Sequence, residues 1–495
     1  MARASSRYIV SGIIVTGGIK SWQADDTMAM GRRKNERQGE MWVASGALPR
    51  SPGHVFYEKL NSLFAEIGFD AWVEDLCEAY YARKGRPGIP PGVYFRMLLV
   101  GYFEGLGSQR GIAWRCADSL SLRTFLGLAS YEESPDHSSL SLIRERLPWE
   151  VHHAVFQRVV TLSYEMQVLD GRTLGVDSTT LEANAAMKSI VRKDTGENWQ
   201  AYLAAMMREA GVIAPDHNPT IEEMKRFDKS RKNKKVSNDE WESPADPDSR
   251  ITKMKDGTTH LAYKAEHAVD LESSLIVAAE IYPGIAADTQ TLENTVQIAK
   301  SHLEEAGVQN RVPDVVADKG YHSVELLGKL MEDETCRSYI SEPKLPEGKQ
   351  HTWTDKPEEQ RRAFYANQRR GRGDRGRRLQ RQRSERVERT FAHVCETGGA
   401  RRTWLRGIEK VRKRHLIAAA AHNLGCLMRV LFGIGTPRGL QGFAALAAAL
   451  ILALRELHNS LQTRFYLRMV VLLQGHTLAA PSDFHPLTFA SIANS

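Results

Sequence analysis

A chain of 495 residues is long enough for roughly two to four domains, and its 42% hydrophobic and 26% charged content argues against global disorder and against a membrane protein. The net charge of +7 is modest, so it indicates a nucleic-acid partner only where the positive residues cluster. Five scattered cysteines without a CxxC pair argue against a disulfide framework or a zinc module and favour a reducing compartment.

The first third of the chain predicts an extension followed by helices. Residues 1–51 contain a short apolar run broken by glycines, which predicts a poorly ordered extension rather than a signal peptide. Residues 52–150 have apolar side chains at helical spacing, beginning with Phe56, Leu60 and Leu63, which predicts an all-α domain. Ser138 or Ser139 could cap one of its helices. A helix-turn-helix DNA reader is a weak alternative, because helical bundles with surface arginines are commoner.

A stretch rich in β-formers opens the next region, which we expect to span residues 165–432. Leu174 and Val176 predict a short strand that ends on Asp177. A charged segment follows at about 188–256. Its composition predicts a solvated surface insertion, although its Lys and Arg cluster could also follow a phosphate backbone.

Alternating β and α patterns then return. Residues 260–270 and 275–284 predict a hairpin, and residues 289–306 predict a helix for which Asp288 is a natural N-cap. Val315 and Val316 predict a second buried strand, which presents Asp318 at its end. A helix at 324–331 and a strand at 336–343 continue the alternation, so we expect a sheet that contains parallel strands.

The chain from about 345 to 383 is rich in arginine. Twelve arginines lie between Arg361 and Arg389, which predicts a loop that is partly disordered and partly a contact for a polyanion. Val387, Phe391 and Val394 then predict a helix over 386–395, with Glu388 beside its buried edge. A second basic run and an apolar helix at 415–431 follow, and residues 433–495 predict a partly helical tail.

Two strand-end aspartates and a helical glutamate are the parts needed for a pair of divalent metals. Hard cations such as Mg²⁺ take oxygen ligands, and two such ions can activate an attacking hydroxyl and stabilise a leaving oxygen. Nucleophilic serine chemistry fits less well, because no GxSxG elbow surrounds Ser178.

Several segments, in order, resemble bacterial insertion-sequence transposases of the DDE class, in the group numbered four and five. The resemblance rests on GIPPGVYFRMLLVGYFEGLGSQR in the helical part and on DSTTLEANA, AYKAEHAVD, DTQTL, VVADKGYHS and VERTFAHVCETGGARRTWLRG farther on. It implies an α/β fold with an RNase H-like mixed-sheet catalytic core, interrupted by insertions and preceded by the all-α domain. It also implies that Asp177, Asp318 and Glu388 are catalytic metal ligands for two Mg²⁺ or Mn²⁺ ions.

The same resemblance implies double-stranded DNA as the partner, namely element ends and target DNA, and a homodimer on DNA. Many relatives carry Arg four residues before the glutamate and Lys seven after it, where this chain has Ser384 and Cys395. We therefore expect neighbouring and downstream arginines to contact phosphate: Arg383, Arg386, Arg389, Arg401, Arg402 and Arg406. Glu385 remains a rival for the third ligand.

The expected function is a cytoplasmic, nucleoid-associated transposase without a membrane partner. It would hydrolyse a phosphodiester at each element end and use the freed 3′-hydroxyl to attack target DNA. Two alternatives stay open: an RNase H-like nuclease without strand transfer, and a catalytically inactive DNA-binding repressor.

Overall fold

The computed structural model describes residues 54–437, apart from 86–87, 130–131, 232–236, 255–256, 309–312, 333–335, 344–352 and 355, together with Arg455. The expected extension over 1–51 and nearly all of the expected tail over 433–495 lie outside the described residues.

The helical part packs around aromatic and aliphatic side chains, and Phe56, Leu60 and Leu63 are buried as their spacing predicts. The helix His137–Arg146 is capped by Asp136 and not by Ser138 or Ser139 as expected. The Asp136 carboxylate accepts a hydrogen bond from the backbone N–H of Ser139. The helices are α1 (His54–Glu66), α2 (Phe69–Cys77), α3 (Pro91–Phe103), α4 (Gln109–Asp118), α5 (Leu120–Phe125), α6 (His137–Arg146) and α7 (Trp149–Glu165), with a short 3-10 turn at Glu78–Tyr80.

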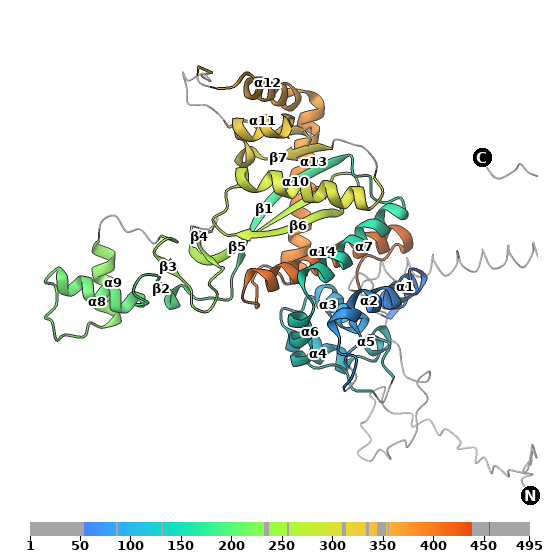
Figure 1. The fold of residues 1–495 in the computed structure, drawn as a ribbon, viewed down its shortest axis with the longest axis horizontal. Coiled ribbons are helices and arrows are strands. Elements are labelled where there is room, and N and C mark those ends of the chain that lie inside the picture. The colour runs from blue at the N-terminus through green and yellow to red at the C-terminus, as the bar shows by residue number, and fades with distance from the viewer. Residues whose placement is uncertain are drawn as a thin grey trace, which may run out of the picture. The chain divides into compact units, whose positions relative to one another are not determined.

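A mixed sheet forms the centre of the second part (Figure 1). The strands run in the order β4-β5-β1-β7-β8, with β6 also paired to β5. β1 is parallel to β7, and β7 is parallel to β8, whereas β5 is antiparallel to β1 and β6. The bounds are β1 (Thr173–Glu182), β4 (Arg250–Lys253), β5 (Thr259–Asp270), β6 (Ile276–Pro283), β7 (Asp314–Ala317) and β8 (Arg337–Ile340).

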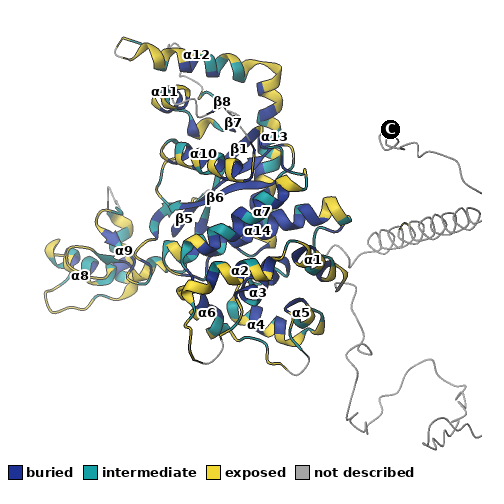
Figure 2. Ribbon diagram, turned by 45° about the vertical axis from the view of Figure 1, so that its right-hand side comes forward, coloured by how far each residue is buried: buried dark blue, intermediate teal, exposed yellow. Residues whose placement is uncertain are grey.

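Helices cover both faces of this sheet (Figure 2). Arg383 on α13 contacts Asp177, whereas Asp288 on α10 contacts Ser178, the next residue along β1. Because successive side chains of a strand point to opposite faces, α13 and α10 lie on opposite sides. The helices are α10 (Asp288–Glu305), α11 (Val324–Glu332), α12 (Glu358–Arg372), α13 (Asp374–Phe391) and α14 (Ile408–Phe432), with a 3-10 turn at Lys319–Tyr321 and a π-helical turn at Ala392–Thr397. The expected α/β, RNase H-like mixed-sheet core behind an all-α region is confirmed.

Two buried asparagines hold the outer strands. The side chain of Asn423 on α14 accepts from the Ile276 backbone N–H at 2.8 Å and donates to its carbonyl at 2.7 Å. Asn367 on α12 makes the same pair with Ile340, at 2.9 and 2.8 Å. Each asparagine thereby satisfies backbone groups that would otherwise be buried without partners.

The charged segment between β1 and β5 folds into short helices and strands. It contains β2 (Val191–Arg192), a 3-10 turn at Met187–Ser189, α8 (Trp199–Glu209), α9 (Ile221–Ser230) and β3 (Trp241–Glu242). Leu203, Met207 and Met224 form a small apolar cluster between its two helices. Thr220 and Glu223 form a capping box at the start of α9. The surface insertion predicted for about 188–256 thus contains secondary structure of its own, because these few apolar residues pair its two helices.

The arginine-rich segment is also helical where it is described. α12 and α13 cover 358–391 with a break at Gly373, so the expected loop is wrong there. Arginine is a good helix former, and the buried faces of both helices are supplied by spaced apolar residues such as Phe364 and Leu379. The helix expected over 386–395 therefore begins earlier, at Asp374, and ends at Phe391.

Helix α14 is long and apolar enough to cross a membrane, and it is the one helix among the described residues that is so. Within the fold 72% of its apolar window is buried, which is the position of a core helix. His415 on α14 contacts His267 on β5, with their Nε2 atoms 2.8 Å apart.

We expect the protein to lose stability as the pH falls below about 6.5, the value of an unperturbed histidine. Burial lowers the pKa of His152, His302 and His422 to about 4 and that of His415 to about 3. Below about pH 6.5 the unfolded chain therefore binds protons that the folded chain does not. Each of these histidines lowers the free energy of unfolding by up to about 1.4 kcal/mol for every pH unit of acidification.

Glu280 acts in the opposite sense, because burial raises its pKa to about 7 and so offsets about one of these protons. Urea unfolding curves at several pH values measure the net slope. A free energy of unfolding that stays constant from about pH 6.5 to about pH 5 would contradict the prediction.

Candidate active site

Asp177 lies in the middle of β1 and not at the end of a strand as expected. The strand continues through Ser178, Thr179 and Thr180 to Glu182, and pairs with β5 over that whole length. Threonine is a good strand former, so the residues that indicated a turn extend the strand instead.

Asp318 follows β7 directly, as expected. In the parallel pair of β1 with β7, Gly175 lies opposite Val316. Two residues farther along each chain stand Asp177 and Asp318. The register therefore brings both carboxylates to the same level of two neighbouring strands.

The Asp177 carboxylate is held on both oxygens. Its Oδ2 accepts from Nη1 of Arg383 at 2.7 Å, and its Oδ1 accepts from the backbone N–H of Ser178 at 2.8 Å. Arg383 is only 9% exposed. Arg383, which we expected to contact phosphate, therefore forms an ion pair with Asp177, the first of the expected metal ligands.

Gly175 allows helix α13 to approach β1 closely. A Cβ there would lie 2.6 Å from Leu271, 2.9 Å from Val387 and 3.2 Å from Arg383. We expect Gly175→Ala to lower the free energy of unfolding by about 1–3 kcal/mol, the usual cost of overpacking. Gly371→Ala is the control, because it meets no atom within 4 Å and is expected to be neutral or slightly stabilising. Chemical denaturation measures both, and equal effects would contradict this account.

Asp288 lies beside Asp318, an arrangement that the sequence did not indicate. A Cβ on Gly320 would lie 2.8 Å from Asp288 Oδ2 and 3.0 Å from Asp318 Oδ1. The Ser178 hydroxyl donates to Asp288 Oδ1 at 3.1 Å. Asp288 is the first residue of α10 and not its N-cap, which is Ala287. In the sequence, the feature that could have indicated a role for Asp288 is its position as the first residue of the DTQTL motif.

A buried ion pair supports this side of the site. Lys264 Nζ lies 2.6 Å from Asp288 Oδ1 and 3.1 Å from Glu266 Oε2. Glu266 is fully buried and also accepts from the hydroxyls of Thr295 and Tyr321. Tyr321 belongs to the turn that follows Asp318, so the network connects β5, α10 and that turn.

Glu388 and Glu385 are one helical turn apart on α13, and both are exposed. Glu388 accepts from the Ser384 hydroxyl at 3.0 Å, whereas Glu385 pairs with Arg389 at 2.7 Å. Gln380, about two turns before Glu388, donates to the Ala317 carbonyl, one residue before Asp318.

The expected DNA-contact arginines form two groups. Arg386 and Arg389 are on α13, where Arg386 reaches the turn between β5 and β6 by donating to the carbonyl of Glu272. The downstream arginines gather at the far end of β1, where the segment around 401–403 pairs with Glu182. There Arg401 pairs with Glu396, Arg402 lies 3.6 Å from Glu182, and Arg406 donates to the carbonyl of Asn184.

The acidic side chains of this site are of the type that binds a hard divalent cation. Asp177, Asp318 and the adjacent Asp288 offer only oxygen atoms. Across the described residues, however, no three acidic, histidine or cysteine side chains are grouped closely enough to hold an ion. Arg383 already occupies one oxygen of Asp177, so Asp177 can ligate a metal through that oxygen only after this ion pair opens.

Comparison with protein families gives two matches. Residues 47–146 match a transposase domain, DUF772, and residues 227–424 match the transposase DDE domain. Together they cover more than half of the chain, and Asp318 and Glu388 lie within the second match. The fold and these two matches define an RNase H-like transposase. The chain belongs to the insertion-sequence DDE transposases. No curated protein and no solved structure matches it.

Proposed function

We propose that this transposase cleaves phosphodiester bonds at the ends of its element and joins the freed 3′-hydroxyl to target DNA. The observation that carries the proposal is the level placement of Asp177 and Asp318 on neighbouring parallel strands, because two carboxylates so placed can share the ligation of catalytic cations.

Asp177, Asp318 and Glu388 would hold the cations, two Mg²⁺ or Mn²⁺ ions. When bound, these ions would activate the attacking hydroxyl and stabilise the leaving oxygen. We take Glu388 rather than Glu385 as the third ligand, because Glu388 has the place of the glutamate in the VERTFAHVC segment on which the resemblance rests. Gln380, about two turns before it on α13, donates to the Ala317 carbonyl beside Asp318.

The arginines of α13 and of the segment after it would bind the phosphate backbone. Arg401, Arg402 and Arg406 lie near the end of β1 that is beyond Asp177. They contact the exposed Glu396, the half-buried Glu182 and the backbone carbonyl of Asn184, respectively. Guanidinium groups pair bidentately with phosphate. Binding would release counterions, so affinity should fall steeply as the salt concentration rises. We further propose a homodimer on DNA in the bacterial cytoplasm.

The test uses purified full-length protein with double-stranded DNA taken from the flanks of the reading frame. The proposal expects nicks and joined products that require Mg²⁺ or Mn²⁺ and that disappear in Asp177→Ala and Asp318→Ala. Nicks without joined products would support the nuclease instead. Salt-sensitive binding with no product, unchanged by either substitution, would support the inactive repressor.

A further inference from the structure

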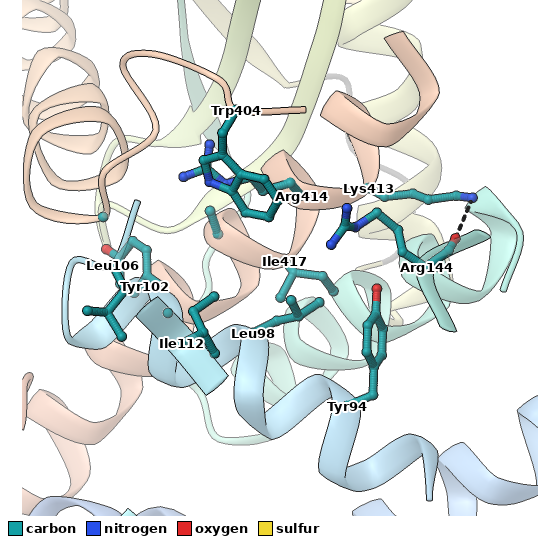
Figure 3. Close-up of a pocket in the computed structure, with 13 residues that line it drawn as sticks. Tyr94, Leu98, Tyr102, Leu106, Ile112, Arg144, Trp404, Lys413, Arg414 and Ile417 are labelled. Carbon is teal, nitrogen blue, oxygen red and sulfur yellow. Dashed lines mark hydrogen bonds between the residues drawn. The ribbon is translucent and has the colours of Figure 1, made fainter. Parts of the chain in front are cut away.

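A small cavity lies where α3 and α6 of the helical part meet α14 and the segment before it (Figure 3). Its volume is about 30 Å³, which holds one or two water-sized particles. Apolar side chains such as Leu98 and Ile417 form part of its wall, and three cationic side chains form another part.

Two of the cations stack on the same aromatic ring. The guanidinium carbons of Arg144 and Arg414 lie 5.2 Å and 5.1 Å from the centre of the Trp404 ring. Arg144 comes from α6, whereas Arg414 comes from α14, so the Trp404 ring brings two like charges together at the junction. Arg144 is only 5% exposed.

The carboxylates nearby serve other partners. Lys413, the third cation, pairs with Glu409 at 2.6 Å, and Glu145 pairs with Lys410 at 2.7 Å. Arg414 donates to the carbonyl of Gly399, which is neutral. Among the described residues neither guanidinium forms an ion pair, although buried charges are normally paired.

The protein groups that could ionise beside them stay neutral. Burial raises the pKa of the Tyr94 hydroxyl, which contacts Arg144, well above its ordinary value. Burial likewise raises the pKa of the Cys395 thiol near Arg414 to about 12. Burial and the charge of Arg144 lower the pKa of Arg414 to about 10. A pKa falls in this way when no negative charge stabilises the protonated form.

Two buried donors also lack acceptors among the described residues. They are Nη2 of Arg144 and Nε1 of Trp404, and both residues line the cavity. Both atoms can only donate, and leaving such a donor unsatisfied costs about 1–3 kcal/mol. A particle that accepts hydrogen bonds and carries negative charge would satisfy both needs.

We propose that this cavity binds one monatomic anion of the size of chloride, held by Arg144, Arg414 and Trp404. The volume excludes phosphate, sulfate and nucleotides as fully enclosed ligands. The bound anion offsets the repulsion between the two arginines and so fastens the helical part to the catalytic core. This site is separate from the carboxylates and does not depend on the proposed DNA chemistry.

The test measures thermal unfolding of the full chain in sodium chloride and in sodium gluconate of equal ionic strength. A ligand of the folded state raises the midpoint with the logarithm of its concentration above the dissociation constant, so chloride should raise it and gluconate, which is too large, should not. Line broadening of ³⁵Cl in NMR spectra of the folded protein gives a direct second readout.

Arg144→Gln should remove the chloride-specific rise and the line broadening. Trp404→Phe keeps an aromatic ring but loses the donor, so its midpoint should begin to rise only at higher chloride, a result that does not depend on Arg144→Gln folding. Arg362→Gln removes one charge from a side chain that is 72% exposed on α12 and should behave like the parent. The proposal is overturned if chloride and gluconate act alike on the parent, or if Trp404→Phe keeps the parent's chloride dependence.

Discussion

Replacing Glu388 with glutamine should slow metal-dependent DNA cleavage on the order of a thousandfold or more, because a metal site supplies several kcal/mol of transition-state stabilisation. Glutamine keeps the size of the side chain and removes its charge. Ser384, whose hydroxyl donates to Glu388, can still donate to the amide oxygen, so we expect the fold to remain intact.

Glu385→Gln is the matched control, since Glu385 is one helical turn away, is also exposed, and pairs with Arg389 instead of Ser384. Its ion pair with Arg389 is on the surface, so losing it should cost little and leave the cleavage rate within about threefold of the parent. Initial rates on end-containing DNA, with circular dichroism to check folding, measure both variants. If Glu385→Gln loses activity and Glu388→Gln keeps it, Glu385 is the third ligand.

Replacing Lys264 with methionine should lower the free energy of unfolding by about 3–5 kcal/mol, because it leaves Glu266 and its neighbour Asp288 without their cation. Lys264 is 6% exposed and Glu266 is fully buried. Tyr321 and Thr295 donate hydroxyls to Glu266, but they cannot neutralise its charge.

Lys329→Met removes a lysine that is 64% exposed and 3.8 Å from Glu293, so it should cost no more than about 1 kcal/mol. Adding Glu266→Gln to Lys264→Met should recover part of the lost stability, since the uncompensated buried charge is gone. Urea unfolding measures all three proteins. A double variant that is no more stable than Lys264→Met alone would show that charge compensation is not the role of this lysine.

The two aspartates could be predicted from the sequence because each follows a short apolar run, and short apolar runs form buried strands. The extent of β1 could not. Ser178, Thr179 and Thr180 suit both turns and strands, and only the pairing with β5 over 262–270 settles the matter. The ligand role and the third acid remain predictions.

The buried ion pair of Lys264 with Glu266 could not be predicted either, because it too depends on contacts between distant segments. Lys264 and Glu266 alternate with apolar residues, a pattern typical of a strand with one face in water. Helix α10 covers that face here, so both charges are buried and pair with each other. For the arginines of α13 the prediction failed for a different reason. Their charge indicated a loop, but arginine is a good helix former and the apolar residues between them form a buried face, so the segment is a helix.

The asparagine contacts with β6 and β8 also restrict how this protein can assemble. An outer strand with free N–H and C=O groups is a template on which a strand of another chain can add. At Ile276 and Ile340 the amide side chains already make the pair of bonds that an incoming strand would make, and α14 and α12 pack beside these strands. Two copies of this transposase therefore cannot join their sheets at these two points, so any association between copies uses other parts of the surface.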